Sequence, residues 1–270
     1  TVFRGVPLYV TRHPEHIKTV MTSQAFIKPE TGLAARQLRR FRGQGLVTSN
    51  GELWRQQRRL INPAFARKRI EALGPLMVEH TSHMLDSWRP GEERNVADEM
   101  MRLTLGIVAD ALFDHDASAE AATVAEALDV FRTITASTSF IPSWVPLPSV
   151  RRANRALADV DQLVYGLIDR RRAEPRERLE RRTDLLSTLI QLGVGGEQMS
   201  RRQLRDEILT LFLAGHETTS QTLSWTWHLL SKHPDVEARL HEELREVLGG
   251  RPPTVDDELP LTDRILHESM

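Results

Sequence analysis

The chain has 270 residues, of which 40% are hydrophobic and 27% are charged, so it has enough apolar material for a sizeable globular core. Its 36 Lys and Arg against 37 Asp and Glu leave a net charge of -1, which gives no reason to expect nucleic acid or an anionic membrane as a partner. The absence of cysteine excludes disulfides, cysteine-based zinc or iron–sulfur sites, a cysteine nucleophile and a thiolate-ligated haem within these residues.

The first part of the chain mixes strand and loop signals. Val2 to Val10 contains β-favouring residues around glycine and proline, which predicts a small N-terminal β-hairpin. A short helix is expected to follow from Pro14, and the Arg-rich stretch from Ile27 to Gly45 predicts a long loop. No stretch approaches the roughly 20 apolar residues of a membrane span, and the start does not resemble a signal peptide. We therefore expect a cytoplasmic location with no membrane span.

From Gly51 onward the pattern predicts helices joined by short turns, with a break at Asn62-Pro63. Two apolar stripes with helical spacing are expected to face the core, one at Leu73, Leu76, Met77, His80 and Met84 and one at Met100, Leu103, Leu105, Val108, Ala109 and Leu112.

Two later segments do not follow the amphipathic pattern. Ser139 to Val150 contains three prolines, which predicts a non-helical loop that is either a substrate lid, a membrane-touching patch or a buried connection. Arg170 to Arg182 is rich in charge and is expected to be a solvated helix end and loop.

A long helix is predicted between Ser200 and Pro234. Ser200 with Gln203 three residues later is a capping-box pattern, and no proline interrupts the sequence before Pro234. Such a helix is about 50 Å long at 1.5 Å per residue. Ile208 to Ala214 is apolar nearly all round, which indicates a buried middle.

Gly215 to Ser220 is a polar cluster directly after this apolar run, and buried polar groups need partners. A threonine hydroxyl can bond the carbonyl one turn back, and with the glycine this can open a groove to a water or a diatomic ligand. The alternative is a helix that bonds its own hydroxyls while Glu217 reaches solvent. His216-Glu217 also begins the zinc-peptidase pattern H-E-x-x-H, but Ser220 stands where the second histidine is required.

The segment Ala214-Gly215-His216-Glu217-Thr218-Thr219 resembles the oxygen-activation signature of the cytochrome P-450 family, the haem-thiolate monooxygenases. That resemblance implies that Thr218 and Glu217 are catalytic residues that deliver protons during oxygen activation. It also implies that Ala214 and Gly215 bind the cofactor by lying against the face of the haem. His216 would lie on the same side, as a packing or substrate-pocket residue.

Two further motifs resemble the same family in the same order. Trp54 and Arg58 are one helical turn apart and carry donors suited to a carboxylate, although surface packing is the commoner role of such a pair. By resemblance they would bind the haem propionates, while Arg55 and Arg59 would be solvated. Glu268 resembles the acid of the family's structural Glu-x-x-Arg pair, whose arginine would follow Met270.

The resemblance implies a mainly α cytochrome P-450-like fold with a small N-terminal β element, and residues 1–270 as one partial domain. The axial cysteine is absent from this chain, so no residue here is expected to ligate the metal. The expected cofactor is heme b, iron protoporphyrin IX, in a monooxygenase that inserts one atom of O2 into an organic small molecule.

The expected redox partner is a ferredoxin or a flavin reductase, and this chain alone is expected to be inactive. Substrate selection would fall to the loop from Ile27 to Thr48 and to the region of Ser139 to Val150. The rival hypothesis is a non-catalytic helical module, or a truncated relic, that binds a hydrophobic ligand.

Overall fold

The computed structural model describes residues 2–3, 6–7, 9–23, 25–28, 30, 39, 42–114, 147–194 and 197–270. Its helices and strands in chain order are β1 (Val2–Phe3), β2 (Val6–Pro7), α1 (Pro14–Thr22), α3 (Gly51–Ile61), the 3-10 helix η1 (Asn62–Phe65), α4 (Arg67–Glu71), α5 (Gly74–Asp86), α6 (Val96–Phe113), α8 (Pro148–Arg172), α9 (Arg176–Arg181), α10 (Leu185–Gln191), β3 (Gly193–Val194), β4 (Glu197–Gln198), α11 (Arg201–Lys232), α12 (Pro234–Leu248) and α13 (Pro260–Ser269). Helices therefore dominate the fold, as predicted. The strands form two antiparallel hairpins, β1 with β2 and β3 with β4.

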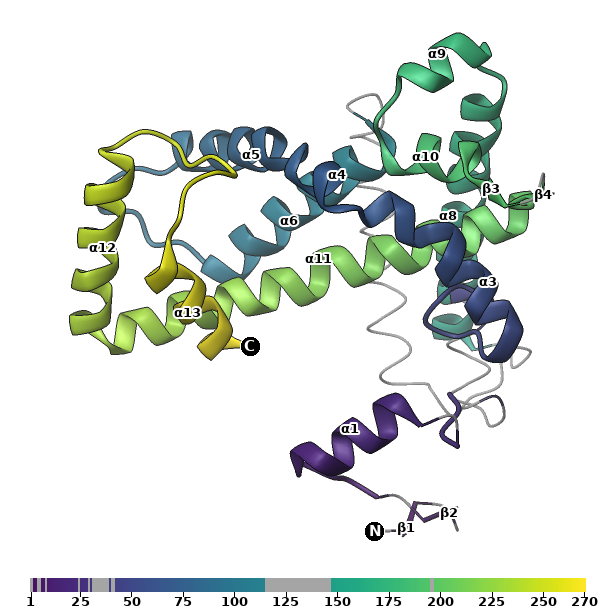
Figure 1. Ribbon diagram of the computed structural model, residues 1–270, viewed down its shortest axis with the longest axis horizontal. Helices are drawn as coiled ribbons and strands as arrows, with labels where there is room; N and C mark the ends of the chain where they lie inside the picture. Colours follow the sequence, from purple (N-terminus) through teal and green to yellow (C-terminus); the bar gives the residue numbers. More distant parts are fainter. Residues whose placement is uncertain are drawn as a thin grey trace.

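Helix α11 is the long axis of the molecule (Figure 1). The side chain of Ser200 accepts a hydrogen bond from the backbone N–H of Gln203, and the side-chain oxygen of Gln203 accepts one from the backbone N–H of Ser200. The helix ends at Lys232, and Pro234 begins α12. The predicted capping box and both ends of the long helix are therefore confirmed.

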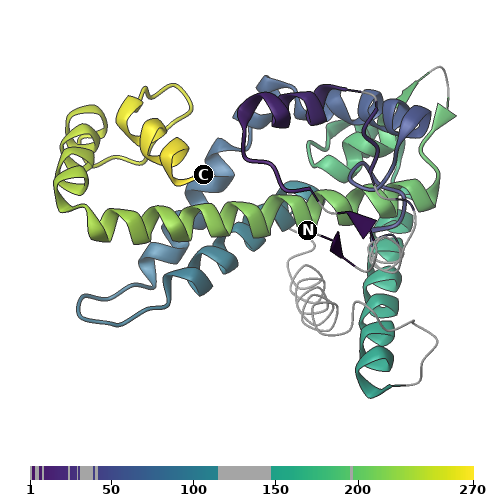
Figure 2. The ribbon, with the colours of Figure 1, turned by 90° about the horizontal axis from the view of Figure 1, so that it is seen from below.

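The core surrounds the N-terminal half of α11. Ile208, Leu209 and Phe212 are buried there with side chains from α6, α8 and α10. Seen from below, α6 runs alongside α11 while α8 crosses it steeply near its start (Figure 2). Apolar burial of this kind is the main stabilising contribution to such a helix, because each fully buried aliphatic side chain is worth about 1.5–3 kcal/mol.

The two predicted core stripes differ in outcome. On α6, Met100, Ala109 and Leu112 are buried, so this helix does supply a core face. On α5 no residue is fully buried and Met77 is exposed, but the other four residues of the stripe are half-buried, so this helix faces the core only in part. Helix α5 packs over α6 from the outside and shields it only partly.

Most of the Arg-rich segment from Arg170 to Arg182 is exposed, as expected, but Arg171 and Arg182 are exceptions. The guanidinium of Arg171 is only 6% exposed and pairs with the buried carboxylate of Asp184. Arg182 donates to Glu174 at 2.8 Å. A buried charge must be paired, and the partner of Arg171 is Asp184 at the start of α10. The charge run thus joins α8, α9 and α10.

Other local expectations also need correction. Pro148 to Val150 form the first turn of α8, with proline at an early helical position where its missing N–H costs nothing, and residues 139–146 of the predicted loop lie outside the described residues. Arg39 and Arg42 have helical backbone, so the expected long loop from Ile27 to Gly45 contains helix. The β3–β4 hairpin was not expected at all.

The C-terminal end of the chain packs against the far end of α11. Helix α13 is held there by Glu243 of α12, whose carboxylate accepts the backbone N–H groups of Leu261 at 2.6 Å and Thr262 at 2.9 Å. First-turn N–H groups have no acceptor within their own helix, so the carboxylate of Glu243 caps the N-terminus of α13. In the part of the chain that the structure describes, no helix is long and apolar enough to cross a membrane.

Candidate functional site

The hydroxyl groups in the middle of α11 bond carbonyls of their own helix. The hydroxyl of Thr218 donates to the carbonyl of Ala214 at 2.6 Å, and that of Thr219 donates to Gly215 at 2.7 Å. The Thr218 bond is the one expected from the sequence. Such bonds satisfy the hydroxyl donors without a second element, as in the alternative of a helix that bonds its own side chains.

One face of this segment is open. Ala214 and Thr218, one turn apart, are both exposed, although the residues just before them are buried on nearly every side. The small side chain of Ala214 leaves the backbone accessible beside the Thr218 hydroxyl. A flat ligand can therefore approach this face closely.

Glu217 is half-buried on a neighbouring face of α11. Its charge acts on Arg42: burial lowers the pKa of the Arg42 guanidinium, and the carboxylate of Glu217 opposes that shift. The carboxylate therefore does not simply extend into solvent. Arg42 was not singled out in the sequence, because nothing in its local pattern shows that it lies near Glu217.

Gly215 faces a different helix. A Cβ atom at this position would lie 2.7 Å from Cγ2 of Val108 on α6, which is closer than side-chain atoms pack. The glycine thus allows α6 and α11 to approach each other. A hydrogen bond of 3.0 Å from the Thr104 hydroxyl of α6 to the carbonyl of His216 lies at the same contact.

His216 is buried by packing within the helix. Its Nδ1 lies 3.0 Å from the carbonyl of Phe212, and its ring centroid lies 5.3 Å from that of the phenylalanine. Because one ring nitrogen is engaged with the backbone, the residue acts as a packing residue, one of the two roles expected for it.

Trp54 and Arg58 lie on α3, at the end of the molecule where α11 begins (Figure 1). Trp54 is 37% exposed and Arg58 is exposed, and among the described residues neither the indole N–H nor the guanidinium has a hydrogen-bond acceptor. Arg55 and Arg59 are exposed as expected, and Arg55 pairs with Glu52 of the same helix. The pair thus offers unused donors to an anionic group.

Glu268 lies near the end of α13 with an exposed side chain. No described residue is paired with it, so its role as half of a Glu-x-x-Arg pair stays a prediction.

The structure also shows a site that the sequence reasoning missed, where residues 42–50 lie across α11. Asp206 and Glu207 are buried, and they accept backbone N–H groups from Gln44 at 2.8 Å and Leu46 at 3.0 Å. A signal was present in the sequence: three adjacent charged residues, starting at Arg205, stand between Leu204 and the apolar run from Ile208 to Ala214. Three consecutive helical positions span about 200°, so they cannot all face solvent.

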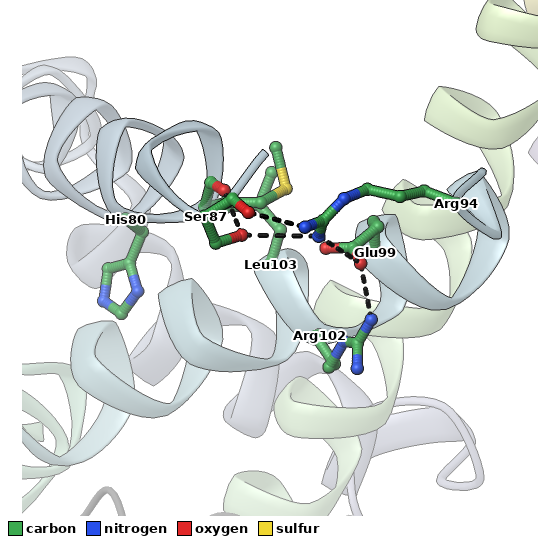
Figure 3. Close-up of a pocket in the computed structure, with 7 residues that line it drawn as sticks. His80, Ser87, Arg94, Glu99, Arg102 and Leu103 are labelled. Atoms are coloured by element: carbon green, nitrogen blue, oxygen red, sulfur yellow. Dashed lines mark hydrogen bonds and ion pairs between the residues drawn. The ribbon is translucent and has the colours of Figure 1, made fainter. Parts of the chain in front are cut away.

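A separate cavity of about 310 Å³ lies between the end of α5 and the start of α6 (Figure 3). There Arg94 and Arg102 both donate to the carboxylate of Glu99, at 3.3 and 2.6 Å, and Arg94 also bonds Ser87. Each cation is already paired, and none of the predicted site residues lines this cavity. We therefore place the candidate site on α11 and α3.

Comparison with known proteins identifies the chain's relatives. The family model described as Cytochrome P450 matches residues 2–270. Cyclooctat-9-en-7-ol 5-monooxygenase of Streptomyces melanosporofaciens is 34% identical over 97% of this chain and 58% of its own length. Pentalenene oxygenase of Streptomyces avermitilis is 33% identical over 97% of this chain and 59% of its own length. The chain thus spans somewhat less than three-fifths of these curated relatives.

Solved structures agree with this family. The haem domain of cytochrome P450DA superposes with a TM-score of 0.76 at 28% identity, covering 88% of this chain and 55% of that chain. A cyanobacterial protein with retinoic acid bound shares the fold, with a TM-score of 0.79 over 94% of this chain and 57% of that chain, at 23% identity. On these sequence and structural matches, the chain belongs to the cytochrome P450 family.

Proposed function

We propose that the complete protein containing this chain is a haem-dependent monooxygenase, which inserts one atom of O2 into an organic substrate and reduces the other to water. The observation that carries the proposal is the open face of α11 at Ala214 and Thr218, inside a segment that matches the family's oxygen-activation signature. Membership of the cytochrome P450 family supports it. The 270 residues would form one part of a single domain.

The donors on α3 fit the proposed cofactor, iron protoporphyrin IX (heme b). Its two propionates are carboxylates, and Trp54 with Arg58 offers an indole N–H and a guanidinium that no described residue uses. Ala214 would lie beside the ring, and Gly215 would take part only through its backbone, because the side on which a Cβ would stand packs against Val108 of α6. Bound haem would supply the redox chemistry that cleaves dioxygen. A thiolate ligand for this haem would have to come from outside these residues, because they contain no cysteine.

Thr218 and Glu217 would move the protons. A hydroxyl has one donor and two acceptor positions, so Thr218 can accept a proton donor's hydrogen bond while its own O–H turns from the Ala214 carbonyl toward the open face. Glu217 supplies a carboxyl group that can exchange protons with solvent. Together they would pass protons from the surface to the oxygen side of the cofactor.

We propose an apolar organic small molecule as the substrate, since two relatives are named for an alkenol and an alkene. The loop from Ile27 to Thr48 and the region of Ser139 to Val150 would select it. The proposed redox partner, a ferredoxin or a flavin reductase, and a cytoplasmic location rest on the family resemblance alone.

The test is haem retention by the complete protein, measured from the absorption band of its reduced carbon monoxide complex. We expect a thiolate-type band in the wild type and at least about tenfold weaker haem affinity in Arg58→Ala, because a hydrogen bond to a charged group is worth about 1.5–3 kcal/mol. Arg59→Ala is the matched control, since Arg59 is exposed one position away. A wild type without the band would overturn the proposed haem-dependent function. Equal haem affinities in Arg58→Ala and Arg59→Ala would overturn the assignment of Arg58 to the propionates.

A further inference from the structure

Residues 42–50 directly precede α3, and they lie against the N-terminal half of α11. A Cβ atom on Gly45 would lie 2.2 Å from the Thr210 hydroxyl oxygen, and one on Gly43 would lie 2.0 Å from the carboxylate of Asp206. Gly43 also has a φ of +61°, a conformation that favours glycine. We call residues 42–50 the docked loop, because only glycine fits at these two contacts.

One residue of the docked loop, Leu46, is held through both of its backbone polar groups. The N–H of Leu46 donates to Oε2 of Glu207 at 3.0 Å, and its carbonyl accepts from Nζ of Lys28 at 2.7 Å. Lys28 also donates to the carbonyl of Ser49 at 3.0 Å. A carboxyl group and an ammonium group thus bind the two successive peptide groups on either side of Leu46.

The same lysine reaches the predicted cofactor site. Nζ of Lys28 lies 5.6 Å from the ring centroid of Trp54, within the range of a cation–π contact. Loop, lysine and indole therefore form one connected set of contacts, and α3 begins directly after the loop. The contacts that hold the backbone of Leu46 therefore also hold the start of α3 in position.

We propose that Glu207 is a positioning residue that docks residues 42–50 on α11 through the backbone N–H of Leu46, and that this docking is coupled to the uptake of one proton by the Glu207 carboxyl group. The inference rests on the proposed function only where it treats residues 42–48 as part of the loop that selects the substrate. The docking itself requires no cofactor.

The surroundings of Glu207 explain the coupling to a proton. Its side chain is fully buried, only Leu46 donates to it among the described residues, and Oε1 has no partner there. Burial is the largest cause that raises the pKa of Glu207, and the nearby carboxylate of Asp206 raises it further. The hydrogen bond from the Leu46 N–H and the charge of Lys28 lower it in part, and the resulting pKa is about 7. Asp206 itself is bound to Arg205.

The direction of the effect follows from linkage. The docked state has the raised pKa, whereas an undocked loop exposes Glu207 to water and returns its pKa toward the ordinary value of 4.5. The docked state therefore binds a proton more tightly, so docking is favoured below pH 7 and weakens as the pH rises through 7.

The experiment is amide hydrogen exchange of residues 43–50 in the complete protein at pH 6 and pH 8, with each rate divided by the intrinsic exchange rate at that pH. In the wild type we expect the protection of these amides to fall about tenfold from pH 6 to pH 8, from the two pKa values above. In Glu207→Gln, which keeps the acceptor for Leu46 but cannot ionise, protection should be the same at both pH values.

Glu207→Ala removes the acceptor, and we expect low protection of the loop at both pH values, with the amides of α12 unchanged as an internal reference. If that variant does not fold, the comparison of the wild type with Glu207→Gln still decides. Equal pH dependence in those two proteins would overturn the proton coupling, and full protection in Glu207→Ala would overturn the positioning role. Since exchange is read without haem, neither outcome depends on the test of the proposed function.

Discussion

The two halves of α11 use polar residues in opposite ways. In the N-terminal half, Asp206 and Glu207 are buried and bond backbone groups of a loop about 160 residues away in sequence. In the middle, Thr218 and Thr219 are exposed and bond carbonyls of their own helix. Polar groups of the first kind fix the fold, because their partners are lost if the loop moves. Those of the second kind leave stability nearly untouched and remain free to meet a ligand.

Among the predicted changes, Asp206→Ala should weaken the contacts of the N-terminal half of α11 most. The change leaves the buried guanidinium of Arg205 with Asp161 as its remaining partner and leaves the Gln44 N–H unpaired. We expect a loss of about 4 kcal/mol in the free energy of unfolding, measured by urea titration, as is usual for a broken buried ion pair. Asp206→Asn, which keeps an acceptor, should lose less. A loss below about 1 kcal/mol in the alanine variant would show that the loop does not depend on this carboxylate.

Stability should also depend on pH through Glu207. Its folded pKa of about 7 lies above the ordinary 4.5, so its contribution is present below pH 4.5 and is lost as the pH rises through 7. The difference in unfolding free energy between the wild type and Glu207→Gln should shift by roughly 2–3 kcal/mol over this window. Thermal or urea unfolding at several pH values measures it, and a difference that is constant with pH contradicts the burial of an ionisable Glu207.

Gly43→Ala tests how closely the loop touches α11. The added Cβ would lie 2.0 Å from the Asp206 carboxylate at a φ of +61°, and we expect a loss of about 2–3 kcal/mol in unfolding free energy. Gly249→Ala is the matched control, since its φ is +57° and nothing lies within 4 Å of the added atom. It should lose only about 1 kcal/mol. Equal losses would mean that the loop lies farther from the helix.

The middle of α11 should show the smallest change in stability. Thr218→Ala and Thr219→Ala each remove an exposed hydroxyl that bonds its own helix, so each should change the unfolding free energy by less than about 0.5 kcal/mol. Urea unfolding of both variants beside the wild type is the measurement. A loss above about 1 kcal/mol in either would mean that its hydroxyl helps hold the fold.

The sequence was informative about α11 because its signals are local. The capping box at Ser200, the proline at 234 and the bond from Thr218 to Ala214 all depend on residues within four positions of one another. The resemblance of Ala214 to Thr219 to a known signature is local in the same sense. Such features are predictable because helical geometry alone places the partners.

The remaining features depend on contacts between distant segments. Arg171 stands in a charge run that is typical of a solvated helix end, and only the fold brings Asp184 to it. Gly215 is part of a recognised signature, yet its close neighbour is Val108 of another helix. The docking of Leu46 on Glu207 joins residues 161 positions apart, and no local periodicity predicts it.

The most direct test of the proposed function is the amount of product formed per pair of electrons consumed, in the complete protein with its redox partner and an apolar substrate. We predict that Thr218→Ala lowers this ratio severalfold, since proton delivery by a positioned side chain contributes at least about 100-fold to such steps. Thr219→Ala, whose hydroxyl makes the same kind of bond one residue away, should keep the wild-type ratio. Full coupling in Thr218→Ala would contradict the account.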